Sequence, residues 1–324
     1  MRVGTGSLLF EAIEGWGELP RGWSYGGVAA GVAVDSQDQV YVFNRGEHPV
    51  VVFDSEGRFL GSWGEGKFTR PHAICIAPDE TIYCIDDNGQ AIHRFRDNGT
   101  LLESLTVAEP SDTGYKPGYP HSVIRSGPPF CYPTDLVIAP NGDIFVSDGY
   151  GNARIHRYDS GHRLLRSWGD PGSEPGQFVI PHGLCVDGDG RVYVADRQNQ
   201  RIQIFDREGQ LITIWDDIRC PNKMVIDKEG IMYVAELGLV VTGDIDALRY
   251  SPEGPYARIT ARDKNGRILA QWGAQEPTGK GLYFAPHGIA IDSQKNLYVG
   301  EVAASYSRGE AAADKTVLNK YVRL

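Results

Sequence analysis

Residues 182–215 read HGLCVDGDGRVYVADRQNQRIQIFDREGQLITIW, and this stretch decides the fold because the chain repeats it. Close copies of the same frame occupy 31–64, 72–105 and 134–169, and weaker copies begin at Asn222 and His287. Within each copy, short runs of alternating apolar residues flank Asp-Gly, Asn-Gly or related turn sequences, a pattern typical of short antiparallel strands. Units of about 40–45 residues with four strands each are typical of propeller blades. The sequence therefore predicts an all-β chain folded as a six-bladed β-propeller.

We expect the propeller to form one domain over residues 1–324. Its blades are expected at approximately 31–64, 72–105, 134–169, 182–215, 222–273 and 287–324. An additional strand-like run, Leu8–Ile13, precedes the first repeat and is expected to supply the outer strand of the sixth blade. This strand would close the ring and remove the open edges of a partial ring. Extra residues at 106–130, at about 237–249 and at 302–316 fall in loops of one face, where function usually lies, and 106–130 is the expected lid.

Composition excludes several classes of protein. With 41% hydrophobic and 23% charged residues among 324, the chain is apolar enough to pack a core. The net charge of −10 and the absence of a basic run argue against nucleic acid as a partner. The chain has no apolar stretch of about 18 residues, so no membrane span is predicted. Nothing in the sequence implies an obligate protein partner. The five cysteines include no CxxC pair, which favours buried thiols in a reducing compartment and predicts a cytoplasmic protein.

Three of the eight histidines occupy one position of the repeat. The residues that open the innermost strands are, in order, Ala30, His72, Thr134, His182, Asn222 and His287. The histidines fall in alternate blades, about 120° apart around the ring, so their imidazoles are expected to converge on the axis. Three neutral nitrogens around an open position form a catalytic zinc site, although iron, cobalt or manganese also bind imidazole. The alternative for each histidine is a turn residue that caps a neighbouring carbonyl.

A second group of residues lies just after the second strands of the repeats, where the sequence offers Arg45, Tyr150 and Arg197. Guanidinium groups bind carboxylates through two parallel hydrogen bonds, and a tyrosine beside a divalent cation can act as a base. The alternative for the arginines is a solvated rim position or a partner of the acidic residue that precedes them in the repeat. We expect those acidic-position residues to form turns; they are Asn44, Asp86, Asp148, Asp196, Glu236 and Glu301.

The repeats resemble the NHL pattern VDxxGxVYVADxxNxRIxxFDxxG, and four runs resemble one family more specifically. These runs are FCYPTDLVIAPNGDIFVSDGYGNARI, GQFVIPHGLCVDGDGRVYVADRQNQRIQIF, VFNRGEH and FAPHGIAI. Over about residues 25–320 the chain is similar to peptidyl-α-hydroxyglycine α-amidating lyase, a six-bladed zinc lyase. The resemblance implies that the three aligned histidines bind zinc and that Tyr150 deprotonates a substrate hydroxyl. It further implies that Arg45 and Arg197 hold the substrate carboxylate.

Two departures from the family concern its metals. Ala285 stands where the family has a methionine near the zinc, which predicts a roomier or differently shaped pocket. Gly288 stands where the family has an acidic residue that helps to hold a structural calcium ion. The backbone carbonyls of Val32 and Ile74, at the remaining calcium positions, cannot supply the missing charge. The sequence therefore disfavours calcium.

A third departure concerns a disulfide. Gly151 stands beside the tyrosine where secreted members have a cysteine, so Cys131 lacks its partner. This fits an intracellular protein and a substrate other than a secreted peptide.

We expect a zinc-dependent lyase that cleaves the C–N bond of a carbinolamide, an N-acyl or N-carbamoyl α-hydroxy acid. The products would be an amide and glyoxylate or a related keto acid, and the substrate a small anion. Two alternatives remain open. One is a metal-dependent hydrolase or lactonase acting on a small anionic substrate through bound water, and the other is a non-catalytic NHL interaction module.

Overall fold

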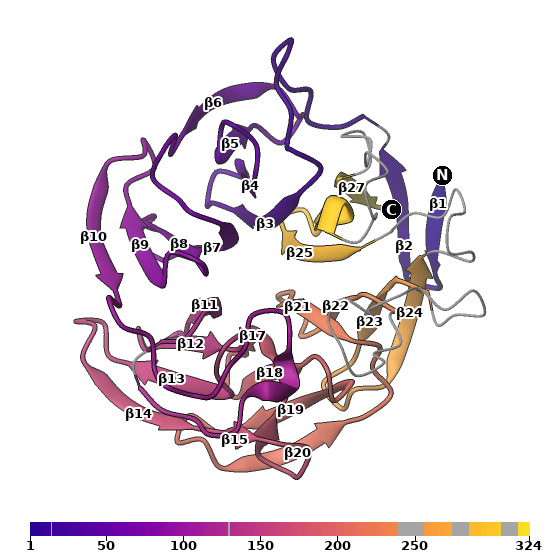
Figure 1. The fold of residues 1–324 in the computed structure, drawn as a ribbon. Coiled ribbons are helices and arrows are strands. Elements are labelled where there is room, and N and C mark those ends of the chain that lie inside the picture. The colour runs from indigo at the N-terminus through magenta and orange to yellow at the C-terminus, as the bar shows by residue number, and fades with distance from the viewer. Residues whose placement is uncertain (14, 129, 239–255, 274–284, 306–316) are drawn as a thin grey trace.

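The computed structural model describes residues 1–13, 15–128, 130–238, 256–273, 285–305 and 317–324 of the chain. Within them, six antiparallel sheets of four or five strands stand radially around a central axis (Figure 1). The innermost strands of neighbouring blades contact one another around the whole ring. The prediction of an all-β, six-bladed propeller is confirmed.

Each blade runs from the axis outward, and the strand bounds match the repeats. Blade 1 contains β3 (Ala29–Val34), β4 (Val40–Asn44), β5 (Val50–Phe53) and β6 (Phe59–Trp63). Blade 2 contains β7 (Pro71–Ile76), β8 (Ile82–Asp86), β9 (Ala91–Phe95) and β10 (Leu101–Thr106), and blade 3 contains β11 (Pro133–Ile138), β12 (Ile144–Asp148), β13 (Arg154–Tyr158) and β14 (Leu164–Trp168). Blade 4 contains β17 (Pro181–Val186), β18 (Val192–Asp196), β19 (Arg201–Phe205) and β20 (Leu211–Trp215), and blade 5 contains β21 (Pro221–Ile226), β22 (Met232–Glu236), β23 (Arg258–Arg262) and β24 (Ile268–Gly273). Between blades 3 and 4, β15 (Asp170–Pro171) pairs in parallel with β16 (Gln177–Phe178).

Blade 6 is assembled from both ends of the chain. It contains β25 (Pro286–Ile291), β26 (Leu297–Glu301), β27 (Leu318–Arg323), β2 (Leu8–Ile13) and, outermost, β1 (Arg2–Thr5). The predicted N-terminal strand β2 pairs antiparallel with the C-terminal strand β27, with Phe10 opposite Arg323. Phe10 is fully buried and its ring lies 5.2 Å from that of Trp272 in blade 5. The N-terminal strand therefore closes the ring as predicted and packs blade 6 against blade 5.

Hydrogen bonds from backbone N–H groups to an aspartate side chain stabilise the tight turn between the first two strands of a blade. In blade 4, Asp187 Oδ1 accepts the backbone N–H groups of Asp189 at 3.0 Å and Arg191 at 2.9 Å. Gly190 adopts φ +80° in this turn, a conformation that favours glycine. The same pair of aspartate bonds recurs in blades 1, 5 and 6, at Asp35, Asp227 and Asp292. The third residue after the aspartate has a positive φ in these turns and is glycine in blades 4 and 5, but Asp38 in blade 1 and Lys295 in blade 6.

A tryptophan at the end of an outer strand packs under a turn glycine of the next blade. A Cβ atom on Gly209, whose φ is +76°, would lie 2.7 Å from the ring of Trp168. The corresponding pairs in other blades are Gly99 on Trp63 and Gly266 on Trp215. The glycine is required twice, by its backbone angle and by the close approach of the indole. Neighbouring blades are thus held in a fixed relative position.

The acidic position at the end of the second strand is structural, as predicted. Its carboxylates accept backbone N–H groups from the segment that leads into the innermost strand of the same blade. The observed bonds are Asp148 with Cys131 at 2.9 Å, Asp196 with Val179 at 2.9 Å, Glu236 with Arg219 at 2.8 Å and Glu301 with Ala285 at 2.9 Å. Burial raises the pKa of Asp196 to about 6. These bonds position the segments that lead to the aligned residues, among them His182 and His287.

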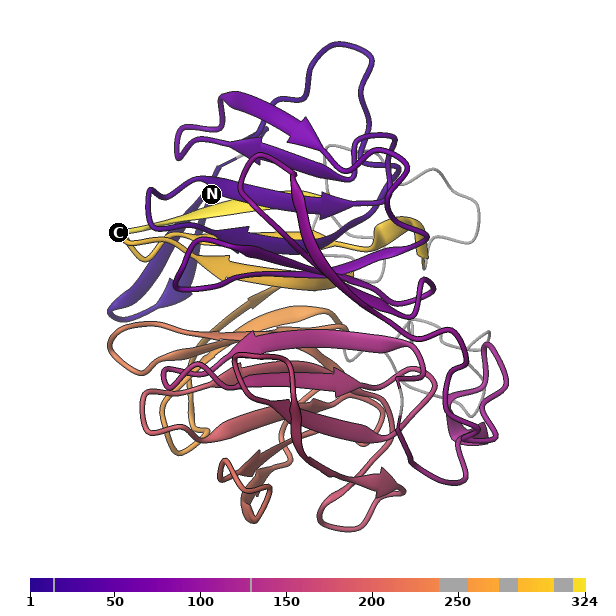
Figure 2. The same cartoon turned by 90° about the vertical axis from the view of Figure 1, so that its left-hand side faces the viewer.

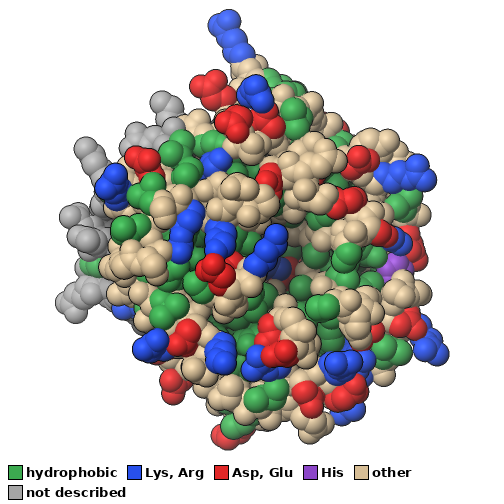
Figure 3. Space-filling view, turned by 180° about the vertical axis from the view of Figure 1, so that it is seen from behind, with side chains coloured by type: hydrophobic (Ala, Val, Ile, Leu, Met, Phe, Trp, Pro, Cys, Tyr) green, Lys and Arg blue, Asp and Glu red, His purple; other side chains and the backbone are tan. Residues whose placement is uncertain are grey.

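The two faces of the propeller differ. The short 3₁₀ turns η1 (Pro120–Ser122) and η3 (Ala303–Ser305) lie on one face, at the right of Figure 2, and both chain ends lie toward the other side. Of the predicted insertions, 106–130 lies on the first face, whereas most of 237–249 and 302–316 falls outside the described residues. On the opposite face, Lys and Arg side chains are interspersed with Asp and Glu (Figure 3). No helix among the described residues has the length and apolarity needed to cross a membrane.

Candidate metal centre and active site

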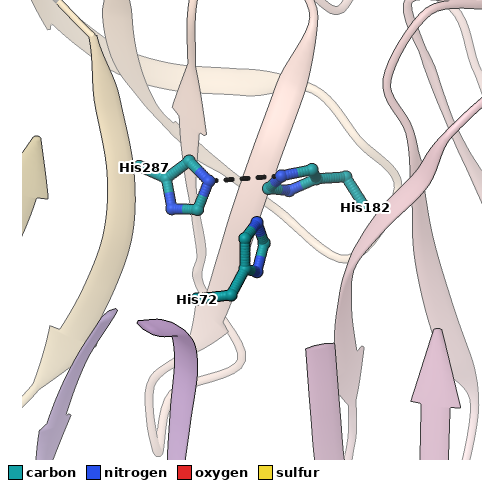
Figure 4. A group of neighbouring side chains, drawn as sticks. All are labelled: His72, His182 and His287. Carbon is teal, nitrogen blue, oxygen red and sulfur yellow. Dashed lines mark hydrogen bonds between the residues drawn. The ribbon is translucent and has the colours of Figure 1, made fainter. Parts of the chain in front are cut away.

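The three aligned histidines converge on the axis of the propeller (Figure 4). His72, His182 and His287 are each the second residue of an innermost strand, β7, β17 and β25, and all three are buried. Their potential ligand atoms lie within 4.8 Å of one another, and the Nε2 atoms of His182 and His287 are 3.2 Å apart. The fold thus brings together three residues that are more than 100 positions apart in the chain.

Each histidine is oriented by a backbone carbonyl of the following blade. The Nδ1 atoms of the three rings lie close to carbonyl oxygens, at 2.6 Å for His72 and Thr134, 3.0 Å for His182 and Asn222, and 2.7 Å for His287 and Ala30. Because a carbonyl oxygen only accepts hydrogen bonds, each Nδ1 carries the proton and donates it. Each Nε2 therefore directs a lone pair toward the axis, the arrangement found in metal-ligating histidines.

The electrostatic environment keeps these imidazoles neutral. Burial is the largest cause and lowers the pKa of all three, to about 3 for His287 and well below the ordinary value for His72 and His182. Neighbouring positive groups lower the pKa further, among them the other histidines for His72 and Arg197 for His182. With no proton on Nε2, two lone pairs face each other across 3.2 Å between His182 and His287. A cation at this point relieves that repulsion, so the donor set fits zinc or another divalent transition metal.

The predicted tyrosine lies against the histidine cluster. Tyr150 follows β12, and its hydroxyl oxygen lies 2.9 Å from His72 Nε2 and 3.1 Å from His182 Nε2. Its backbone N–H donates to the carbonyl of Tyr132 at 3.2 Å, which fixes the start of the loop. A single phenolic proton serves only one of the two nitrogens at a time. The hydroxyl is therefore placed to exchange a proton at the point where the three lone pairs meet.

Both predicted arginines reach the same site. The guanidinium carbon of Arg197 lies 5.4 Å from the centre of the Tyr150 ring, and the side chain is almost fully buried. Arg45 donates from Nε to the carbonyl of Pro71 at 3.1 Å and from Nη1 to Ser305 Oγ at 3.4 Å. The positive charges of Arg45 and Arg197 both contribute to the lowered pKa of His287. Two cations thus lie close enough to the histidine cluster to influence it, and Arg197 also lies against the Tyr150 ring.

The structure also reveals an ion pair that the sequence analysis missed. Arg70, two residues before His72, donates from Nε and Nη2 to the two carboxylate oxygens of Asp87 at 2.7 and 2.6 Å. Asp87 is fully buried, and its Oδ2 lies 4.0 Å from His72 Nε2. Burial raises the pKa of Asp87, and Arg70 partly offsets that effect. A signal was available, because Asp87 occupies the same repeat position as Arg45 and Arg197.

The expected lid, 106–130, packs beside the tyrosine. Thr113 Oγ1 donates to the carbonyl of Gly151, the residue next to Tyr150. The ring of Tyr115 lies 5.3 Å from that of Tyr132, and burial raises the pKa of Tyr115. The described part of this segment therefore borders the site on the side of blade 3.

The positions expected for calcium do not fit that ion. Val32 and Ile74 line a cavity of about 20 Å³ in the central channel, next to the three histidines. A Cβ atom on Gly288 would lie 2.9 Å from the backbone nitrogen of Val32, so the chain leaves no room there for an acidic side chain. The Lys223 ammonium already lies in this channel, paired with Asp135. A fixed positive charge opposes a second cation, so these residues are a poor fit for calcium, and the expectation that calcium is disfavoured stays a prediction.

Two further departures from the family are visible in the packing. A Cβ atom on Gly151 would lie 2.4 Å from Cys131 Sγ, so the missing disulfide partner would have stood here. None of the five cysteines forms a disulfide within the described residues, and burial raises the pKa of Cys131 to about 11. Ala285 is fully buried in an apolar cluster with Cys220 and Val302, and no enlarged pocket is seen around it among the described residues. The predicted cytoplasmic location stays a prediction.

These observations define the class: a β-propeller with a candidate three-histidine metal centre at its axis. The chain belongs to the NHL-repeat family. A model of the NHL repeat matches residues 130–158 and 178–205. NHL repeat-containing protein 3 of Homo sapiens is 30% identical over 318 residues, which cover 93% of this chain and 83% of that protein.

Other relatives are named as lyases. Peptidyl-α-hydroxyglycine α-amidating lyase 1 of Drosophila melanogaster is 30% identical over 265 residues, which cover 76% of this chain and 45% of that protein. The chain thus spans less than half the length of this relative and is a lyase-like NHL propeller. Among solved structures, a gluconolactonase from Xanthomonas campestris aligns with a TM-score of 0.64 at 13% identity, covering 99% of this chain and 94% of that one. A streptogramin B lyase aligns with a TM-score of 0.58 at 12% identity, covering 96% and 97%. At such identities these two structures support the fold alone.

Proposed function

We propose that the protein is a metal-dependent lyase that cleaves the C–N bond of a carbinolamide, an N-acyl or N-carbamoyl α-hydroxy acid. The products are an amide and glyoxylate or a related keto acid. The observation that carries this proposal is the Tyr150 hydroxyl, which lies within 3.1 Å of two Nε2 atoms in a cluster of neutral histidines. A proton acceptor for the substrate hydroxyl and a place for a Lewis acid thereby coincide. The amidating lyases among the relatives support the same reaction class.

Each residue of the site has a part in this reaction. A divalent metal held by His72, His182 and His287, zinc in the first instance, would polarise a substrate oxygen as a Lewis acid. Arg45 and Arg197 bind the α-carboxylate and orient the substrate. Tyr150, as the phenolate, takes the proton of the α-hydroxyl. The oxygen then forms the carbonyl of the keto acid, the C–N bond breaks, and Tyr150 returns the proton to the departing nitrogen.

The substrate is proposed to be a small anion. The arginines supply cations on a chain whose net charge is −10, so an anion is drawn to this point of the surface. A compound with an N-carbamoyl group, such as a ureidoglycolate, fits the proposed chemistry as well as a peptide does. We place the protein in the cytoplasm as part of the same proposal.

A second candidate is a metal-dependent hydrolase that acts on a small anionic ester or lactone. It is favoured by the buried Asp87 carboxylate, whose Oδ2 lies 4.0 Å from His72 Nε2, because carboxylates activate water in such sites. Arg70 engages both oxygens of this carboxylate, however, which leaves it poorly placed to accept a proton from water. The lyase therefore remains the better-supported function.

The test combines metal analysis with two product assays. Purified protein is expected to contain one divalent transition metal per chain and to release glyoxylate from α-hydroxyhippurate or ureidoglycolate. Metal without glyoxylate, but with hydrolysis of a lactone, would favour the hydrolase. Absence of stoichiometric metal would exclude both enzymes and leave the non-catalytic NHL module.

A substitution tests the role of the tyrosine. Tyr150→Phe removes the group that accepts the proton but no metal ligand, so turnover is expected to fall at least about tenfold while the metal content stays unchanged. Glyoxylate release and metal content are measured on the same preparation. Full activity of this variant would remove Tyr150 from the mechanism.

A further inference from the structure

The Arg70–Asp87 ion pair at the histidine cluster has no part in the reaction as derived so far. The guanidinium carbon of Arg70 lies 5.5 Å from the centre of the Tyr150 ring, nearly the same distance as that of Arg197 at 5.4 Å. Its charge contributes to the lowered pKa of His72 and of His287. Arg70 therefore faces the same volume as the groups assigned to the substrate.

The pair holds Arg70 in one orientation. Two parallel bonds join the guanidinium to Asp87, and the Asn88 N–H donates to Asp87 Oδ1 at 2.7 Å. Asp87 has no exposed side-chain surface, whereas 36% of the Arg70 side chain is accessible to solvent. Nε and Nη2 are engaged, and Nη1 has no hydrogen-bond partner within the described ranges. The carboxylate thus anchors one edge of the guanidinium, and the other edge keeps donors for a ligand.

The proposed reaction requires a donor that neither Arg45 nor Arg197 supplies. When the C–N bond of an N-acyl carbinolamide breaks, the electron pair goes to nitrogen and is delocalised onto the acyl oxygen. This oxygen gains negative charge only as the bond breaks, so a donor there stabilises the transition state more than the bound substrate. The α-carboxylate, at the other end of the substrate, already uses the two predicted arginines.

We infer that Arg70, positioned by Asp87, donates from Nη1 to the acyl or carbamoyl oxygen of the departing amide. The inference rests on the proposed function and assigns a protein group to the carbonyl oxygen on the leaving nitrogen of its substrate class. The bond that breaks is C–N, the bond that forms is the second C–O bond of the keto acid, and the proton passes from the hydroxyl to nitrogen through Tyr150. Arg70 stays protonated throughout, because it only donates hydrogen bonds.

The test compares two double variants of the same blade. Arg70→Met with Asp87→Asn removes the donor without leaving a buried, unpaired carboxylate. The control, Arg94→Met with Asp79→Asn, removes an ion pair of 2.7 Å in which Arg94 lies 5.5 Å from the Tyr83 ring, away from the histidines. Turnover is measured for α-hydroxyhippurates whose benzoyl ring carries 4-methoxy, no substituent or 4-nitro. Affinity for glyoxylate, which has a carboxylate but no acyl nitrogen, and metal content are measured alongside.

The Arg70→Met/Asp87→Asn variant is expected to lose about 100-fold in turnover on the unsubstituted compound. The loss should be largest for 4-methoxy and smallest for 4-nitro, because the poorer leaving amide depends more on the donor. Glyoxylate affinity and metal content should match the control, whose turnover should change less than about twofold. An equal loss across the series, or a loss of glyoxylate affinity, would overturn the role of Arg70 while the proposed function stands. If wild-type protein releases glyoxylate neither from these compounds nor from ureidoglycolate, the proposed function and this inference fail together.

Discussion

The second residue of the innermost strand is histidine in blades 2, 4 and 6, whereas it is Ala30, Thr134 and Asn222 in blades 1, 3 and 5. The even blades supply Nε2 lone pairs to the axis, and the odd blades supply the backbone carbonyls that fix the three rings. Anchoring through the backbone explains why the odd position tolerates three unrelated residues. The ligands from the even blades therefore depend on the identity of the residue, whereas the carbonyl groups of the odd blades depend only on the fold.

The odd blades also hold the prolines that precede the histidines. Thr134 Oγ1 donates to the carbonyl of Pro181 at 2.9 Å, and Asn222 Nδ2 donates to that of Pro286 at 2.8 Å. Ala30 has no side-chain donor, and Arg45, in the same blade, donates instead to the carbonyl of Pro71 at 3.1 Å. Arg45 thus makes a structural bond in addition to the role in substrate binding proposed for it.

The largest expected effect comes from substituting one aligned residue of an even blade and one of an odd blade. His182→Gln removes a ligand, and metal affinity is expected to fall by more than about 100-fold. Asn222→Ala keeps the carbonyl that orients His182, so its metal affinity should fall less than about tenfold. Competition with a chromophoric chelator measures both. Equal losses in the two variants would show that even and odd positions do not differ in the way described.

At the next position along the innermost strands, the odd blades rather than the even blades supply charged side chains. The residue after the aligned position is small in the even blades, whereas blades 3 and 5 supply the charged pair Asp135 and Lys223. Asp135 Oδ2 also accepts the N–H of Leu184 at 2.8 Å, so this carboxylate joins three inner strands across the channel. The built-in ammonium takes up the negative charge that would otherwise require an ion.

Lys223→Ala tests whether the Lys223 ammonium takes the place of a cation in the channel. The variant leaves Asp135 as a buried carboxylate without its partner, a change that costs about 3–5 kcal/mol of stability. Millimolar calcium is expected to raise the thermal unfolding temperature of the variant and to leave that of the wild type unchanged. Lys223→Ala with Asp135→Ala is the matched control and should show no calcium effect. Stabilisation of the wild type by calcium would contradict the account.

The pH dependence of stability tests whether the three histidines are neutral in the folded protein, and its expected effect is smaller. In the metal-free protein their folded-state pKa values lie below the unfolded value of about 6.5, so below that pH the unfolded chain binds more protons. The stabilising contribution is complete above pH of about 6.5 and is lost as the pH falls toward the pKa of about 3 at His287. Each histidine should contribute a slope of up to about 1.4 kcal/mol per pH unit. Urea unfolding in chelator between pH 7 and 5 measures it, and His287→Gln should show a shallower slope; an unchanged slope would count against a neutral His287.

Much of the fold was predictable because the blades are nearly independent copies of one unit. Local spacing in the sequence indicates the turns, the terminal tryptophans and the alternating histidines. Leu8–Ile13 has the pattern of a strand, and the repeats leave blade 6 without its outer strand. Tyr150 was found because it lies in the short segment after the second strand of blade 3, and the equivalent segments of all blades lie on one face of the ring.

The site features that were missed are ion pairs, and the repeat marks the position of Asp87 without specifying its partner. Arg70 and Asp87 are contributed by different segments of blade 2, and Lys223 and Asp135 by blades 5 and 3. Their distances follow only once the blades are packed. The carbonyl anchors were equally hidden, because a backbone oxygen carries no sequence signal.

The central claim is that the even-blade histidines hold a metal ion with an open position beside Tyr150. Cobalt substitution tests it most directly, because Co²⁺ bound by three imidazoles has visible absorption bands that report its coordination. The account predicts one Co²⁺ per chain, bands that shift when an α-hydroxy acid is added, and loss of those bands in His182→Gln. A spectrum identical to that of free aqueous cobalt, or one that survives in His182→Gln, would contradict it.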